Sequence, residues 1–171
     1  MFQHIDQVYE LLSKTGLQRK SGNIIYSGYE TLSQGDYYFL GINPGGHIDD
    51  KNPKEDQIVK KLIKKKEYPE ENEYFDGIWG KERLPGVHHH QQNIQAFFEC
   101  LEMDLRKVFS TNLCFQRSPG TSKYPGGKSQ MEADIQKFWP IHEYMLSVVK
   151  PKVIICNGAD ARDYFKKLIN P

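Results

Sequence analysis

The chain has few cysteines. Its three cysteines, Cys100, Cys114 and Cys156, are odd in number and lie far apart. They form neither a CxxC pair, which redox and zinc sites use, nor the even set that a disulfide framework needs. We therefore expect reduced thiols, no metal centre and a cytoplasmic location.

Long apolar runs and a strong net charge are also missing. Polar residues follow Met1 within the first few positions, so we expect neither a signal peptide nor a membrane span. The formal net charge is +1, so any attraction to nucleic acid has to come from local clusters of basic residues. One cluster, in residues 60–66, is followed directly by acidic residues, which is typical of a solvated charged helix.

What the chain does have is length for one domain and many aromatic residues. It contains 171 residues with ten Tyr, nine Phe and two Trp, which favours a compact domain with aromatic-lined clefts. Apolar periodicity predicts helices over residues 4–12, 55–66, 93–105, 135–149 (interrupted at Pro140) and 159–168. It predicts strands over residues 37–42, 108–115 and 152–158, and a short β-type run over 23–26.

The alternation of strands and helices predicts an α/β fold. We expect a single domain over residues 1–171 with three αβα layers, in which helices cover both faces of a largely parallel sheet. Ligands bind beyond the carboxyl ends of the strands in such sheets. The loops that begin at Asn43, Phe115 and Gly158 can all lie at that edge and build one pocket.

The loop after the first predicted strand is rich in glycine. Gly41-Ile42-Asn43-Pro44-Gly45-Gly46 follows an apolar run that is typical of a strand buried on both faces. One interpretation is a tight bend with no chemical role. A small-molecule enzyme that holds a phosphate here is a further alternative, although no Walker lysine, GxGxxG or nucleophile-elbow pattern supports it.

Residues 68–90 show no clear period. This segment contains Tyr74, Phe75 and Trp79, and a long irregular segment in a compact domain often forms a lid or wall. It ends in His88-His89-His90, whose side chains would alternate faces if the segment were extended. We expect an exposed polar loop there, with contact to a base or phosphate as the alternative.

Three stretches together resemble the uracil-DNA glycosylase superfamily. The string from Phe39 to Gly46 resembles the water-activating motif of its mismatch-specific and single-strand-selective branches, GINPG or GMNPG after an apolar strand. The strand around Ser110-Thr111-Asn112-Leu113 is similar to the one whose Asn contacts the base, and residues 151–161 are similar to a later strand-Gly-x-x-Ala turn. The resemblance covers residues 37–165.

The resemblance implies a role for each candidate site residue. Asn43 would position the attacking water, and Asn112 would bind N3–H and O4 of a flipped-out uracil. The remaining expected substrate-binding residues are Gly41, Ile42, Pro44, Gly45 and Gly46 in the loop, with Phe75 and Trp79 as stacking platforms. The expected DNA contacts are Arg117, Ser118, Lys123 and Lys128.

The chain departs from the family in one respect that bears on catalysis. The second family motif, HPS or NPS on a later strand, has no counterpart before Pro171, so we expect a C-terminally shortened domain. His88, His89 or His90 would then have to supply the missing catalytic donor. The iron–sulfur cysteines of some branches are also missing, so we expect no cofactor.

Two functions remain in view. The first is a monofunctional DNA glycosylase, expected to be a monomer, that removes uracil or a related damaged or modified base. The second is a module of the same fold that binds nucleic acid or a protein partner without turnover.

Overall fold

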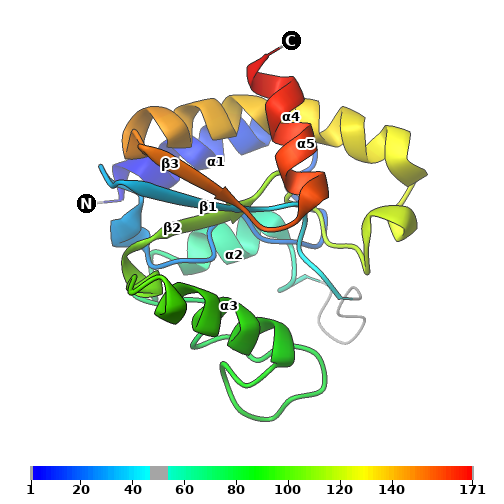
Figure 1. Cartoon of the computed structure of the whole chain (residues 1–171). Coiled ribbons are helices and arrows are strands. Elements are labelled where there is room, and N and C mark those ends of the chain that lie inside the picture. Colours follow the sequence, from blue (N-terminus) through cyan, green and yellow to red (C-terminus); the bar gives the residue numbers. More distant parts are fainter. Residues whose placement is uncertain (1, 47–53, 171) are drawn as a thin grey trace.

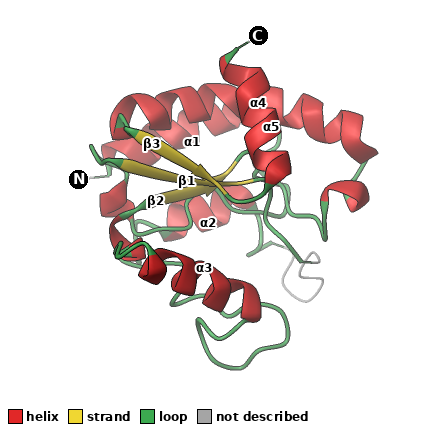
Figure 2. Cartoon of the chain, in the orientation of Figure 1, coloured by secondary structure: helices red, strands yellow, loops and turns green. Residues whose placement is uncertain are grey.

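The computed structural model describes residues 2–46 and 54–170 and confirms the α/β architecture. Its sheet has three parallel strands in the order β2-β1-β3, with β1 (Tyr37–Gly41) at the centre. β2 (Phe109–Asn112) and β3 (Val153–Cys156) flank it (Figures 1 and 2). Each strand ends earlier than predicted, and β2 and β3 also begin one residue later than predicted.

Helices cover both faces of the sheet, as the sequence predicts. α1 (Gln3–Thr15) and α4 (Gly127–Val149) pack together on one face, while α3 (His89–Cys100) covers the other (Figure 1). α2 (Ile58–Lys64) packs against α1, and α5 (Ala159–Ile169) follows β3. This arrangement forms the three expected layers.

The alternation of side chains along β1 divides the interior into two cores. Tyr38 and Leu40 join the larger core with α1 and α4. Phe39 points to the opposite face and joins a smaller core that includes Ile94 and Phe98 of α3. Side chains at β1 positions 39 and 41 therefore face α3, which puts the end of β1 and the start of its loop on that side.

The predicted β-type run over residues 23–26 is not a strand. Its backbone runs beside β2, where Asn23 N donates to Phe115 O and Tyr26 N donates to Ser110 O. Only isolated bridges form nearby, at Ser21 and Gly22. Further hydrogen bonds hold the segment from two sides, since Thr111 Oγ1 donates to Ile24 O over 2.6 Å and Glu73 N donates to Tyr26 O over 2.7 Å, but these bonds do not form a continuous ladder with one strand.

Several helix predictions were wrong at their ends. α1 ends at Thr15 instead of Leu12, and α2 spans Ile58–Lys64 instead of residues 55–66. α3 begins at His89 instead of Asn93, because a capping box at His88 starts it one turn earlier, and it ends at Cys100 instead of Leu105. α4 begins at Gly127 and continues through Pro140. An interior proline costs about 3 kcal/mol in a helix, and the neighbouring core side chains offset that cost here, since they are buried on both sides of Pro140.

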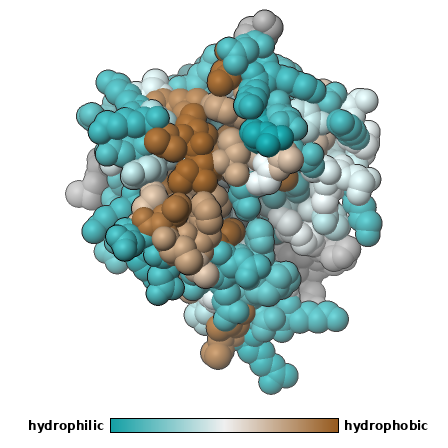
Figure 3. Space-filling view, viewed as in Figure 1, coloured by the Kyte–Doolittle hydropathy of each residue, from teal (hydrophilic) through white to brown (hydrophobic). Residues whose placement is uncertain are grey.

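No helix among the described residues is long and apolar enough to span a membrane. One side of the molecule nevertheless carries apolar side chains at its surface, gathered over β3 and the adjacent part of α3 (Figure 3). The exposed large apolar residues of these elements are Val153 and Phe97. β3 is an outer strand of the sheet, so its free edge borders this patch.

Candidate functional site

The three loops predicted to meet do leave the sheet at one edge. Gly41 ends β1 and lies beside Asn112, the last residue of β2. Asn157 directly follows β3, and its N–H donates to Leu40 O over 2.8 Å. Polar side chains from three distant parts of the sequence are therefore placed at neighbouring strand ends.

Gly41 is required by the side chain of Asn112. A Cβ built on Gly41 would lie 2.1 Å from Asn112 Oδ1, which is far inside van der Waals contact. The amide of Asn112 thus lies across the end of β1 in the space that a larger residue would fill. Asn112 also hydrogen-bonds to the Tyr26 hydroxyl, and it is 7% exposed. The glycine is explained by this close approach, not by a bend of the chain.

We expect Gly41→Ala to lower the free energy of unfolding by about 1–3 kcal/mol, the usual cost of overpacking, because Asn112 has to move. Chemical denaturation measures this loss. Gly45→Ala is the matched control, since a Cβ there meets nothing within 4 Å. Equal stability of the two variants would show that Asn112 does not occupy the position described.

Asn43 lies two residues beyond Gly41, and its amide is oriented by the loop that follows β2. Its Nδ2 donates to Ser118 O at 3.1 Å, to Ser118 Oγ at 3.0 Å and to Pro44 O at 2.8 Å. No described residue donates to Asn43 Oδ1. The amide therefore presents an acceptor oxygen whose direction is fixed by three contacts on its nitrogen.

Arg117 clamps the glycine-rich loop. Its Nη1 donates to Gly45 O over 2.6 Å, while Nε and Nη2 bind the two carboxylate oxygens of Asp56 at 3.1 and 3.0 Å. The side chain is 18% exposed, so most of the guanidinium is turned toward the protein. The structure thus ties the predicted phosphate ligand Arg117 to the loop itself.

Asp56 is held as a carboxylate by its surroundings. Burial raises the pKa of Asp56, but hydrogen bonds from Arg117 and Ser21 and the charges of Arg117 and Lys61 outweigh it, so the pKa lies below the ordinary value. A buried anion facing Arg117 keeps the clamp closed at neutral pH.

The other predicted DNA contacts differ in exposure. Ser118 is buried, and its Oγ donates to Gly120 O over 2.9 Å. Lys123 is exposed on the segment between β2 and α4, and Lys128 is exposed in the first turn of α4. The Lys128 ammonium also lies 5.9 Å from the ring centroid of Tyr164. Among the four predicted DNA contacts, these two lysines are the exposed cationic residues.

The histidines were expected in an exposed polar loop; His89 and His90 are exposed, but they begin α3, and His88 is its N-cap, so the loop prediction was wrong. His88 caps α3: its Nδ1 accepts from His90 N over 3.3 Å, and its own N–H donates to Gln91 Oε1 over 3.1 Å. His89 lies against the His88 ring at 4.3 Å between centroids. His90 is one of the residues that line a cavity, described below.

The irregular segment before α3 is anchored by two glutamines that the sequence analysis did not single out. Gln91 Nε2 donates to Glu73 O and Gly77 O over 2.6 and 2.8 Å. Gln95 Nε2 donates in the same way to Tyr74 O and Gly86 O. Their spacing of four residues on one helix face is the signal that could have found them.

The two predicted stacking platforms are occupied by other contacts. Trp79 packs edge-on to Tyr26 and Tyr74, and its Nε1 donates to Glu73 Oε2 over 3.1 Å. Phe75 lies under the guanidinium of Arg106, 4.4 Å from its ring centroid. Both rings are therefore engaged by neighbouring side chains, and neither lines the cavity beside α3.

Comparison with known proteins adds no family. No protein-family model and no curated protein matches the chain. The case for a function therefore depends on the geometry of the site.

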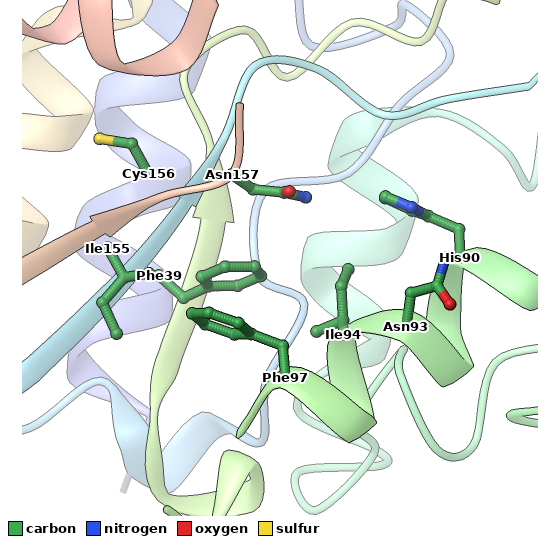
Figure 4. Close-up of a pocket in the computed structure, with 8 residues that line it drawn as sticks. All are labelled: Phe39, His90, Asn93, Ile94, Phe97, Ile155, Cys156 and Asn157. Carbon is green, nitrogen blue, oxygen red and sulfur yellow. The ribbon is translucent and has the colours of Figure 1, made fainter. Parts of the chain in front are cut away.

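A cavity of about 310 Å³ opens between the sheet and α3. Its walls come from β1, from the segment 155–157 at the end of β3 and from one face of α3 (Figure 4). The lining residues are Phe39, His90, Asn93, Ile94, Phe97, Ile155, Cys156 and Asn157. Of these lining residues, sequence reasoning had placed only His90 among the site residues. An asparagine directly after an apolar strand is the signal that could have found Asn157.

Proposed function

We propose that the chain is a monofunctional DNA glycosylase that hydrolyses the N-glycosidic bond of uracil or a related base flipped out of DNA. The observation that carries this proposal is the placement of two asparagine amides, Asn43 and Asn112, at the ends of neighbouring parallel strands. Gly41, which has no side chain, lies between them.

The chemistry requires an oriented water on one side of the sugar and donors or acceptors at the base. In the reaction the C1′–N bond breaks with its electron pair going to the base, and the water oxygen bonds to C1′. The proton that the water loses ends on the released base. A fixed acceptor for the water and a polar partner for the base anion lower the activation barrier of this hydrolysis.

Asn43 fits the first of these tasks. Its Nδ2 is held by Ser118 and Pro44, so Oδ1 is left to accept from a water. An amide oxygen is a weak base, but a hydrogen-bond acceptor suffices when the glycosidic bond is largely broken before the water attacks. The clamp by Arg117 on Gly45 keeps this loop in place without occupying Oδ1.

Asn112 fits the second task. One of its contacts is made to the Tyr26 hydroxyl, and an amide can form further bonds through its oxygen and second N–H. An acceptor beside a donor matches the N3–H and O4 of uracil, whereas cytosine presents the opposite pattern at these atoms. Of the three histidines, His90 is the candidate for the additional donor, since His88 is engaged in capping α3.

The test is strand cleavage after alkali on oligonucleotides that carry uracil, hypoxanthine, a modified cytosine or no altered base. We expect cleavage at the altered base and a loss of roughly 10²-fold or more in Asn112→Ala, because one aligned partner of the leaving base is removed. Asn170→Ala, an exposed asparagine at the end of α5, is the matched control. Full cleavage by Asn112→Ala would remove Asn112 from the mechanism.

The binding module without turnover stays as a second candidate. The exposed Lys123 and Lys128, on the segment that follows β2 and in the first turn of α4, favour it, because such groups bind phosphates whether or not a base is cut. Salt-sensitive binding of single-stranded DNA with no cleavage of any substrate would support this candidate and contradict the glycosylase.

A further inference from the structure

The cavity beside α3 borders the same strand ends that carry the proposed site. Phe39 of β1 pairs with Ile155 of β3, and both side chains line the cavity. Side chains two residues further along each strand face the same side of the sheet. The next positions are Gly41 and Asn157, so Asn112, Gly41 and Asn157 form one row across three neighbouring strand ends.

The opposite wall is the first half of α3. His90, Asn93 and Phe97 lie three or four residues apart and so share one helix face. In Figure 4 the Asn157 amide points from the end of β3 toward α3, and the His90 imidazole points from α3 toward the sheet. The Phe39 and Phe97 rings lie below them. The cavity thus has an apolar aromatic floor and a polar rim.

The polar groups of this rim are available to a ligand. Within residues 2–46 and 54–170, the side chains of His90, Asn93 and Asn157 accept or donate no hydrogen bond. They contrast with Gln91 and Gln95 on the neighbouring face of α3, each of which binds two backbone carbonyls. Unpaired amides around an apolar floor are what a small-molecule site requires.

The lining also indicates the charge of the ligand. No Lys, Arg, Asp or Glu is among the lining residues. Desolvation lowers the pKa of His90, and the neighbouring His88 and His89 lower it further, so its imidazole is neutral at pH 7 and both donates and accepts. A volume of about 310 Å³ is at the small end of ligand pockets and suits one ring system.

We propose that this cavity binds an uncharged planar heterocycle, with the face of the ring on Phe97 and its polar edge between Asn157 and His90. The identity of the heterocycle rests on the proposed function: it is the base that the enzyme extrudes and releases. Asn157, His90 and Phe97 then add to the contacts that Asn112 makes with the base and help to determine which base is accepted, while Asn43 acts on the attacking water.

The test uses free uracil and the full chain, and it needs no catalysis. In ¹⁵N-resolved NMR spectra, uracil is expected to shift the side-chain amides of Asn157 and Asn93 in a saturable way. The Trp79 indole, whose ring centroid lies 6.2 Å from that of His90, should shift with them. Asn157→Ala is expected to weaken uracil binding about 10-fold, the effect of losing one good hydrogen bond to a buried edge.

Asn170→Ala serves as the control for loss of an asparagine elsewhere, and circular dichroism verifies that each variant is folded. Phe97→Leu gives a second variant that removes the ring face but keeps an apolar side chain; it is also expected to weaken binding. Uracil binding that neither Asn157→Ala nor Phe97→Leu weakens would overturn the inference. The absence of any saturable shift at Asn157 and Asn93 would overturn it as well.

The outcome is separable from that of the proposed function. Uracil binding at Asn157 in a protein that cleaves no oligonucleotide would support the cavity and contradict the glycosylase. The opposite result is also informative. If the protein excises the base, but uracil does not shift the NMR signals of the cavity side chains and the cavity variants bind uracil normally, the glycosylase is supported and the cavity assignment is contradicted.

Discussion

Asn43→Ala is expected to lower the rate of base excision by roughly 10²- to 10³-fold, the usual effect of losing one oriented group at a reacting centre. The reason is geometric. Three contacts on Nδ2 direct Oδ1 away from Ser118, and alanine provides no acceptor for the attacking water. Single-turnover kinetics with enzyme in excess measure the loss directly, because product release does not enter the rate.

DNA binding separates a chemical role of Asn43 from a structural one. Because the amide acts on the water and not on the phosphates, Asn43→Ala should bind a uracil-containing oligonucleotide within a few-fold of the wild-type affinity. Asn43→Asp is informative as a second variant, since a carboxylate keeps the acceptor but cannot donate to the Ser118 and Pro44 carbonyls. An Asn43→Ala protein that excises at the wild-type rate would eliminate the assigned role.

The second large effect is expected at Arg117. Arg117→Ala should lower the free energy of unfolding by about 3 kcal/mol, because among the described residues it leaves Lys61 as the one cationic partner of the buried Asp56 carboxylate. It should also reduce excision, since the loop that carries Asn43 loses its tie at Gly45. Urea denaturation and single-turnover kinetics on the same samples measure both effects.

The chain supplies a matched control for this prediction. Arg106 binds Asp76 through two bonds of 3.2 Å in the same fork geometry, but its side chain is 49% exposed. Arg106→Ala is therefore expected to cost at most about 1 kcal/mol. Replacing both members of the buried pair, as Arg117→Met with Asp56→Leu, should recover part of the stability. Equal losses in Arg117→Ala and Arg106→Ala would contradict the clamp.

Local patterns predicted most of the fold. The runs around Phe39 and Ile154 are continuously apolar, as is typical of strands in a covered sheet, and the strand around Phe109 has apolar residues on either side of Ser110-Thr111-Asn112. Each of the three is followed by a helical period. Those two facts alone imply parallel strands with helices on both faces. The predictions that were wrong lie where tertiary contacts determine the local conformation. Pro140, for example, stays helical because core residues on both sides of it are buried.

The candidate site was predictable in part. A loop after a buried strand singles out the segment that carries Asn43, whereas Asn112 was singled out only through the family resemblance, because the strand was predicted to continue to Phe115. The role of Arg117 could not be found in this way, because its partner Asp56 is 61 positions away and nothing local distinguishes a clamping arginine from a phosphate ligand. The cavity could not be predicted either, because it forms between α3 and the end of β3, which are far apart in the sequence.

Release of free base in a single turnover tests the central claim most directly. With the protein in excess over a single-stranded oligonucleotide that contains one uracil, we predict one equivalent of free uracil per strand and an abasic site in its place. Binding of the same oligonucleotide by the folded protein with no free base released, from uracil or from any other altered base, would contradict the account.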